Sequence, residues 1–256
     1  MTLSQQVRKV IAYAQLHRSF KQYFQVVPAL TDELIQEAQK IRHEVYCREL
    51  GWEPLRDNGL ETDSYDPNSL HCLLKSVVNN RYIGCVRLVL PTESDSGAML
   101  PFQGTCRDGL DSGHPDAAGL AAGTVAEVSR LAIIADYRRR RDEQGKPVAV
   151  PEGQDFSHER RKFPFIPVGL YLGMMQMAKR HGIDTLYFLT EPVLARHFSM
   201  LGGKLVPVGK AIEHRGKRIP YVMKVSEVLG GASILLRPLI REISREVDLQ
   251  MKRHGQ

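Results

Sequence analysis

Residues 126–134 read AEVSRLAII, a stretch that predicts a buried β-strand. Apolar side chains such as Val128 and Ile133 favour a sheet. The same stretch carries a carboxylate, Glu127, and a guanidinium, Arg130, three positions apart. Burying either charge without a partner costs several kcal/mol. We therefore expect both charges to find partners in the fold, and this strand to contribute to a site as well as to the core.

The composition is that of an ordinary globular protein. The chain has 256 residues, 43% hydrophobic and 25% charged, enough for one large domain or two small ones. No apolar run is long enough to span a membrane, and the N-terminus lacks the apolar stretch of a secretory signal, so we expect a cytoplasmic protein. The four cysteines form no CxxC pair and the nine histidines show no metal-ligand spacing, which predicts no metal site. The net charge of +6 favours an acidic partner, such as nucleic acid, an anionic carrier or a membrane surface.

Hydrophobic periodicity and turn residues predict helices and strands along the whole chain. Expected helices cover residues 3–22, 31–50, 163–182, 192–203 and 232–250. Expected strands cover residues 24–30, 70–78, 81–91, 126–134, 183–190, 204–209 and 218–229. Strands and helices mix without strict alternation, which predicts one α/β domain around a mixed sheet.

Three residues around the second expected helix stand out. Arg42 and Tyr46 lie four positions apart, so they share a face of that helix. Trp52, the only tryptophan, lies just past its end. Taken alone, Arg42 is typical of a solvated or salt-bridged surface residue.

Charged residues recur in the neighbouring strands and loop. Arg87 lies among apolar residues in GCVRLVLP, as Arg130 does in its strand, and strand arginines of this kind need buried partners. Candidate partners are Glu127 and the pair Asp63 and Asp66 in ETDSYD, although aspartates in a loop are also typical turn formers. A charged network that links a helix, a loop and two strands is more often a site than a scaffold.

Four motifs in the same order, RHEVYCRELGW, ETDSYD, GCVRLVLPT and EVSRLAI, resemble those of the acyl-homoserine lactone synthases over roughly residues 25–210. The resemblance implies a GNAT-type acyltransferase fold: a central twisted mixed sheet flanked by helices, with an added N-terminal and C-terminal helix. The expected single domain comprises a helical extension (1–23), a core (24–228) and a C-terminal helix (229–256). The extra helix, the 93–124 loop and a basic insert are more similar to long-chain N-acyl amino acid synthases and to acyltransferases associated with the PEP-CTERM/exosortase system.

The resemblance also implies site residues. Tyr46 stands where the lactone synthases usually carry Phe. Catalytic positions by resemblance are Glu127, Ser129 and Arg130. Substrate-binding positions are Arg42, Tyr46, Trp52, Asp63, Asp66 and Arg87.

The expected activity follows from the resemblance and from amine chemistry. A fatty acyl group moves from the phosphopantetheine thioester of acyl-acyl carrier protein to the amine of an amino acid, with no bound cofactor. The amine must lose a proton before it attacks, and Glu127 is the candidate general base. Paired arginine and carboxylate groups suit a zwitterionic amino acid. The alternative is an acyl-homoserine lactone synthase that uses S-adenosylmethionine.

The geometry of the strand leaves two possibilities for Arg130. Glu127 and Arg130 would face opposite sides of a regular strand, and a β-bulge would change that. Otherwise Arg130 would pair with Asp63 or Asp66 on the other face.

Other features carry weaker signals. No pyrophosphate-binding loop of coenzyme A-dependent enzymes follows Ile134, which favours the carrier protein as donor. An apolar helix could line an acyl-chain pocket with Leu170, Met174 and Met177, although ordinary core is the stronger interpretation. A basic run could dock the acidic carrier protein, or be a solvated loop: Arg138, Arg139, Arg140 and Arg141. The same run is the only support for a remote alternative, nucleic-acid binding, for which no helix-turn-helix, RNP or zinc pattern is present.

Overall fold

The computed structural model describes residues 20–91, 100–107, 109–111, 124–138, 166–199, 201–234 and 236–255. The expected helix over residues 3–22, apart from its last turn, and most of the 93–124 loop lie outside the described residues.

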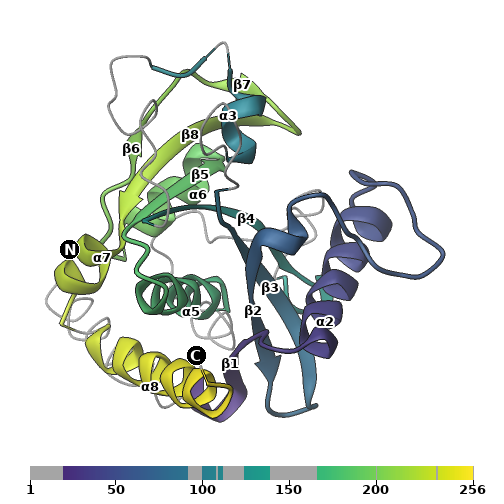
Figure 1. The fold of residues 1–256 in the computed structure, drawn as a ribbon, viewed down its shortest axis with the longest axis vertical. Coiled ribbons are helices and arrows are strands. Elements are labelled where there is room, and N and C mark those ends of the chain that lie inside the picture. The colour runs from purple at the N-terminus through teal and green to yellow at the C-terminus, as the bar shows by residue number, and fades with distance from the viewer. Residues whose placement is uncertain are drawn as a thin grey trace, which may run out of the picture.

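The described strands form one sheet of eight strands in the order β1-β2-β3-β4-β5-β8-β6, with β7 paired to β8. β4 and β5 run parallel, and the other pairs are antiparallel. The expected mixed α/β architecture is therefore confirmed (Figure 1). The strands span Phe24–Pro28 (β1), Ser69–Ser76 (β2), Arg81–Val89 (β3), Val125–Ile133 (β4), Thr185–Thr190 (β5), Val206–Pro207 (β6), Ile212–Glu213 (β7) and Lys217–Lys224 (β8).

Helices cover both faces of this sheet. Figure 1 shows α5 on one face of the β1–β4 half and α2 on the other. The helices span Asp32–Arg42 (α2), Pro101–Thr105 (α3), Ile166–Arg180 (α5), Pro192–Ser199 (α6), Val225–Gly231 (α7) and Arg237–Arg253 (α8), with short 3-10 turns at Asp66–Asn68 and Ala135–Tyr137. No helix among the described residues is long and apolar enough to cross a bilayer.

The helix that carries Arg42 begins where the sequence predicts. The hydroxyl of Thr31 accepts a hydrogen bond from the Leu34 N–H at 3.4 Å and caps α2. Beyond Arg42 the backbone widens into a π-helix, His43–Glu49, which the hydrophobic pattern did not indicate. The helical segment is followed by Gly51, whose positive φ of 61° lets the chain reverse.

The strand of the opening motif has two irregularities. The register between β3 and β4 shifts by one residue between Cys85 and Arg87, so β4 bulges beside Arg130. Arg130 has a φ of 52°, a left-handed conformation that is rare for a residue with a side chain. The bulge brings Arg130 to the face that carries Arg87, as the contacts of both with Asp63 demonstrate.

β4 and β5 are paired over only part of their length. Val125–Val128 pairs with Thr185–Phe188. Beyond that point, within the described strands, residues 129–133 pair only with β3, and residues 189–190 pair with β8. We call this opening the β4–β5 fork.

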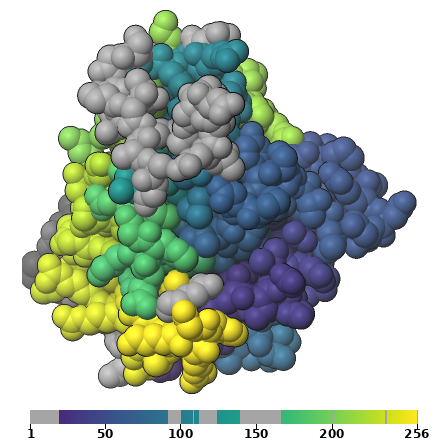
Figure 2. All heavy atoms as spheres, viewed as in Figure 1, coloured from purple at the N-terminus to yellow at the C-terminus, as the bar shows by residue number. Residues whose placement is uncertain are grey.

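The end of the chain differs from the sequence expectation. The strand expected over residues 218–229 stops at Lys224, because Asp184 binds the N–H groups of Val225 and Ser226 and α7 begins there. The C-terminal helix α8 then covers the edge strand β1, where Glu246 accepts from the Val26 N–H at 3.3 Å. Figure 2 shows α8 in yellow beside the purple β1–α2 segment.

Candidate active site

The last residue of α2 lies at the centre of a buried cluster of ion pairs. Arg42 is fully buried. Its Nε donates to the Glu61 carboxylate, and its Nη1 and Nη2 donate to both oxygens of Asp66, at 2.5 and 3.1 Å. Such bidentate geometry fixes the plane of the guanidinium.

Arg87 on β3 joins the same carboxylates from the sheet. It is 2% exposed, and its Nη1 donates to Asp63 at 2.6 Å and to Asp66 at 2.7 Å. Its Nε donates to the hydroxyl of Ser129 on β4 at 3.0 Å. Ser129 therefore orients Arg87.

Arg130 completes the cluster from the bulge of β4. Its Nη2 lies 3.0 Å from Glu61, 3.1 Å from Asp63 and 3.3 Å from Glu53. Its guanidinium also lies 5.5 Å from the centre of the Tyr46 ring. Arg130 thus pairs with Asp63 at a bulge, whereas the sequence led us to expect this pairing only for a regular strand. We call these groups the ion-pair cluster: Arg42, Arg87, Arg130, Glu53, Glu61, Asp63 and Asp66.

Three carboxyls of the ion-pair cluster, Glu61, Asp63 and Asp66, have lowered pKa values and remain ionised. Burial alone would raise the pKa of Asp66, but the hydrogen bonds from Arg42 and Arg87 hold it well below its usual range. Burial opposes ionisation of Asp63 too, and Arg87 keeps its pKa low.

Glu127 lies apart from these ion pairs and behaves differently. It is 5% exposed, and its Oε2 accepts a hydrogen bond from the backbone N–H of Phe102 at 2.6 Å. Burial raises its pKa to about 8, against the opposing effects of Phe102, Arg87 and Arg130. Glu127 lies opposite Tyr187, one residue before the pairing of β4 and β5 ends. The β4–β5 fork therefore holds a carboxyl that can exchange a proton near neutral pH.

Two aromatic rings form a wall beside the ion-pair cluster. The rings of Tyr46 and Trp52 lie 6.0 Å apart. The Tyr46 hydroxyl donates to the Leu131 carbonyl on β4 at 3.0 Å, and burial raises the pKa of this hydroxyl. The wall therefore reaches β4 in the half that no longer pairs with β5.

Sequence reasoning missed several residues of this region. Glu61 is 2% exposed and joins Arg42 to Arg130, although its place in ETDSYD was a signal. His71 is buried 3.8 Å from Asp66, and burial lowers its pKa to about 4, which keeps it neutral at neutral pH. Arg218 lies at the start of β8, directly after Lys217, so the sequence around it lacked the apolar setting that made Arg87 stand out.

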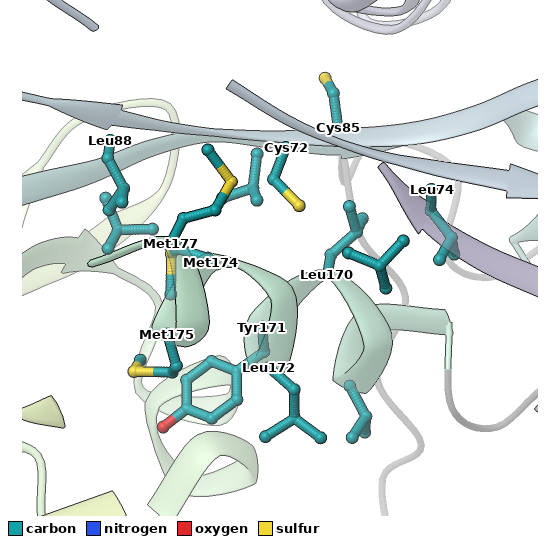
Figure 3. Close-up of a cluster of buried hydrophobic side chains, with 14 of the residues drawn as sticks. Cys72, Leu74, Cys85, Leu88, Leu170, Tyr171, Leu172, Met174, Met175 and Met177 are labelled. Carbon is teal, nitrogen blue, oxygen red and sulfur yellow. The ribbon is translucent and has the colours of Figure 1, made fainter. Parts of the chain in front are cut away.

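The weaker candidates do not join the cluster. Leu170, Met174 and Met177 are at most 1% exposed and pack between α5 and the strands (Figure 3). Their role in an acyl pocket remains a prediction. Arg138 pairs with Glu49 and is 9% exposed, whereas residues 139–141 lie outside the described residues. No described group of histidine, cysteine and acidic residues has the arrangement of a metal site.

Known proteins resemble this chain in sequence. The Acetyltransferase (GNAT) domain family matches residues 41–145, which include Arg42, Glu127 and Arg130. The acyl-homoserine-lactone synthase of Pseudomonas fluorescens is 22% identical over 194 residues, which are 75% of this chain and 80% of that protein. The chain therefore carries a match to a GNAT acyltransferase domain and is similar to the acyl-homoserine lactone synthases.

Solved structures agree with this acyltransferase in fold. BjaI, a CoA-dependent acyl-homoserine lactone synthase, is 17% identical, with a TM-score of 0.53, over 91% of this chain and 90% of its own. FeeM, an N-acyl amino acid synthase from uncultured soil microbes, is 15% identical, with a TM-score of 0.52, over 84% and 97%. The predicted GNAT-type fold is confirmed.

Proposed function

We propose that this acyltransferase is an N-acyl amino acid synthase, which moves a fatty acyl group from acyl-acyl carrier protein to the amine of an amino acid. The observation that supports this most is Glu127, a buried carboxyl with a pKa of about 8 at the β4–β5 fork. A base with this pKa is partly ionised near neutral pH and can accept a proton from an ammonium group.

The proposed reaction balances with the groups of the chain. Glu127 first accepts a proton from the ammonium group of the acceptor, directly or through a water molecule, and releases it to solvent. The neutral amine nitrogen then bonds to the thioester carbon and gives its second proton to Glu127. The C–S bond breaks, and this second proton passes from Glu127 to the departing thiolate. The bulged segment at Arg130 and Leu131 would supply a backbone N–H to the oxyanion of the tetrahedral intermediate.

The proposed donor is a carrier-protein thioester, because the net charge of +6 favours an acidic partner. BjaI is described as CoA-dependent, so the two thioesters must be compared directly. Steady-state rates are measured with acyl-carrier protein and acyl-coenzyme A of the same chain length. A preference for the coenzyme A thioester would contradict this donor.

A second candidate is an acyl-homoserine lactone synthase, which the Pseudomonas fluorescens relative favours. The enzyme is offered acyl-carrier protein with amino acids or with S-adenosylmethionine, and products are analysed by mass spectrometry. We expect acyl amino acids. Lactone and methylthioadenosine without any acyl amino acid would establish the second candidate.

The proposed similarity to PEP-CTERM/exosortase-associated acyltransferases rests on three features of the sequence: the expected N-terminal helix, the 93–124 loop and the basic insert. We infer a cytoplasmic enzyme, since acyl-carrier thioesters would be its donors.

A further inference from the structure

Arg218 stands on the same face of the sheet as Glu127. Glu127 pairs with Tyr187 on β5, and Tyr187 pairs with Val222 on β8. Alternate residues of a strand share a face, so Arg218, four positions before Val222, faces the same side. Its backbone lies opposite the end of β5, where that strand has left β4.

The contacts of Arg218 place its guanidinium between β5 and the aromatic wall. Its Nη1 donates to the Leu189 carbonyl at 3.4 Å, beside the β4–β5 fork. Its guanidinium carbon lies 5.7 Å from the centre of the Trp52 ring. Because Trp52 packs against Tyr46, which is bonded to Leu131 on β4, the guanidinium lies next to the opening of the fork.

The guanidinium of Arg218 has no anionic partner among the described residues. Its Nε is buried without a hydrogen-bond partner, and none of the described carboxylates forms an ion pair with it. Burial lowers its pKa, Tyr46 and Glu191 oppose that effect, and the neighbouring Arg215 and Arg130 reinforce it. A half-buried cation whose buried Nε lacks a partner is costly, and a bound anion would relieve that cost.

The neighbouring charges are already balanced. Arg215, on the β7–β8 turn, also lies 5.7 Å from the Trp52 ring, but it binds Glu53 at 2.8 Å. The four carboxylates of the ion-pair cluster are thus matched by four guanidiniums: Arg42, Arg87, Arg130 and Arg215. Arg218 forms no ion pair with these four carboxylates, and it lies on the same side of the sheet as the proposed base.

We propose that Arg218 binds the α-carboxylate of the acceptor, with the Trp52 ring holding the plane of its guanidinium. The inference rests on the proposed function and assigns a specificity residue to it. A planar guanidinium binds a carboxylate through two parallel hydrogen bonds, which explains the choice of arginine. Both candidate acceptors, an amino acid and S-adenosylmethionine, carry an α-carboxylate next to the amine that reacts.

The test compares acceptors that differ only in the carboxylate. Each of the twenty amino acids, and its carboxamide, is offered with acyl-carrier protein to the wild type, to Arg218→Met and to Arg218→Lys. We expect the wild type to prefer the amino acid by on the order of 10²-fold in kcat/KM. In Arg218→Met this preference should fall toward one, through a rise in KM for the amino acid, while KM for the donor changes little.

Two further variants keep the result interpretable. Arg218→Lys retains the charge but not the two-pronged geometry, so it should retain part of the preference, and it remains informative if Arg218→Met folds poorly. Arg245→Met, on the exposed face of α8, is the matched control and should leave the preference intact.

The outcomes separate the inference from the proposed function. An Arg218→Met enzyme that still prefers amino acids overturns the inference alone. A rise confined to the KM of the donor also overturns it, and would assign Arg218 to the phosphodiester of the phosphopantetheine arm. If the wild type acylates neither amino acids nor S-adenosylmethionine, the proposed function and this inference both fail.

Discussion

The carboxylate of Glu127 accepts a hydrogen bond from the N–H of Phe102 at 2.6 Å, yet its pKa is about 8, because burial outweighs that bond. The base of the proposed reaction is therefore mostly protonated at pH 7. Acyl transfer in the wild type should rise as the pH passes about 8, when Glu127 loses its proton.

Replacing Glu127 with glutamine should remove the base and keep its size. We expect kcat to fall by about 10²–10⁴ if proton transfer limits the rate. The loss should shrink at high pH, where more of the acceptor amine is already neutral. Steady-state kinetics between pH 6 and 10 measure both effects. A folded Glu127→Gln enzyme with wild-type kcat at neutral pH would make Glu127 a structural residue.

The same substitution should lower activity but raise the stability of the fold at high pH. A carboxyl whose pKa is raised from 4.5 to about 8 stabilises the fold below pH 4.5, and this contribution is lost as the pH rises toward 8. Glu127→Gln should thus match the wild type near pH 4.5 and exceed it above pH 8, by on the order of 4 kcal/mol. Denaturation by urea at the two pH values measures this, and equal curves at both would exclude the raised pKa.

The sequence predicts strand β4 and most partners of its charged residues, because the signal lies within short segments of the chain. Glu127 and Arg130 within an apolar run require buried partners, and Arg87 repeats the signal in the next strand. The GNAT-type order of motifs adds Arg42 and the aspartates. These positions could be named before any contact was known.

Other parts of the site depend on contacts between distant segments. Phe102 reaches Glu127 from 25 residues earlier in the chain, in a region that reads as a loop. Glu61 looks in the sequence like an ordinary acidic loop residue, and only its ion pairs with Arg42 and Arg130 in the fold place it in the site. Arg218 becomes notable only because the carboxylates around it are already paired.

Arg130→Ala should destabilise the protein by about 3–5 kcal/mol, because Glu61 and Asp63 each lose one of their guanidinium partners. Arg130→Gly removes the same guanidinium but suits the φ of 52°, so it should be about 1–2 kcal/mol more stable than the alanine variant. Arg48→Ala, an exposed arginine paired with Glu44, is the control and should cost no more than about 0.5 kcal/mol. Urea denaturation ranks the three, and a harmless Arg130→Ala would mean that the ion-pair cluster contributes little.

Tyr46→Phe should separate the ring from its hydroxyl. The hydroxyl donates to the Leu131 carbonyl at 3.0 Å, so its loss should cost about 1 kcal/mol of stability. Activity should change little, because the lactone synthases that this chain resembles usually carry Phe at this position. A large fall in kcat with little loss of melting temperature would instead give the hydroxyl a part in the reaction.

Asp66→Asn should weaken the protein in a way that depends on acidity. Asp66 accepts hydrogen bonds from Arg42 and Arg87, which hold its pKa well below the ordinary value of 3.8 against the effect of burial. A carboxyl of this kind stabilises the fold above pH 3.8 and loses that contribution as the pH falls through its lowered pKa. At pH 7 the variant should be less stable by about 3–5 kcal/mol, since two buried guanidiniums lose a charge partner. The difference in stability should narrow as the pH falls toward 2, because the wild type then begins to lose the same charge.

Asp136→Asn, at an exposed pair with Arg81, is the control and should show almost no difference in stability from the wild type at any pH. Melting temperatures from pH 7 to pH 2 decide the matter: a gap that stays constant would mean that Asp66 acts through its shape and not through its charge.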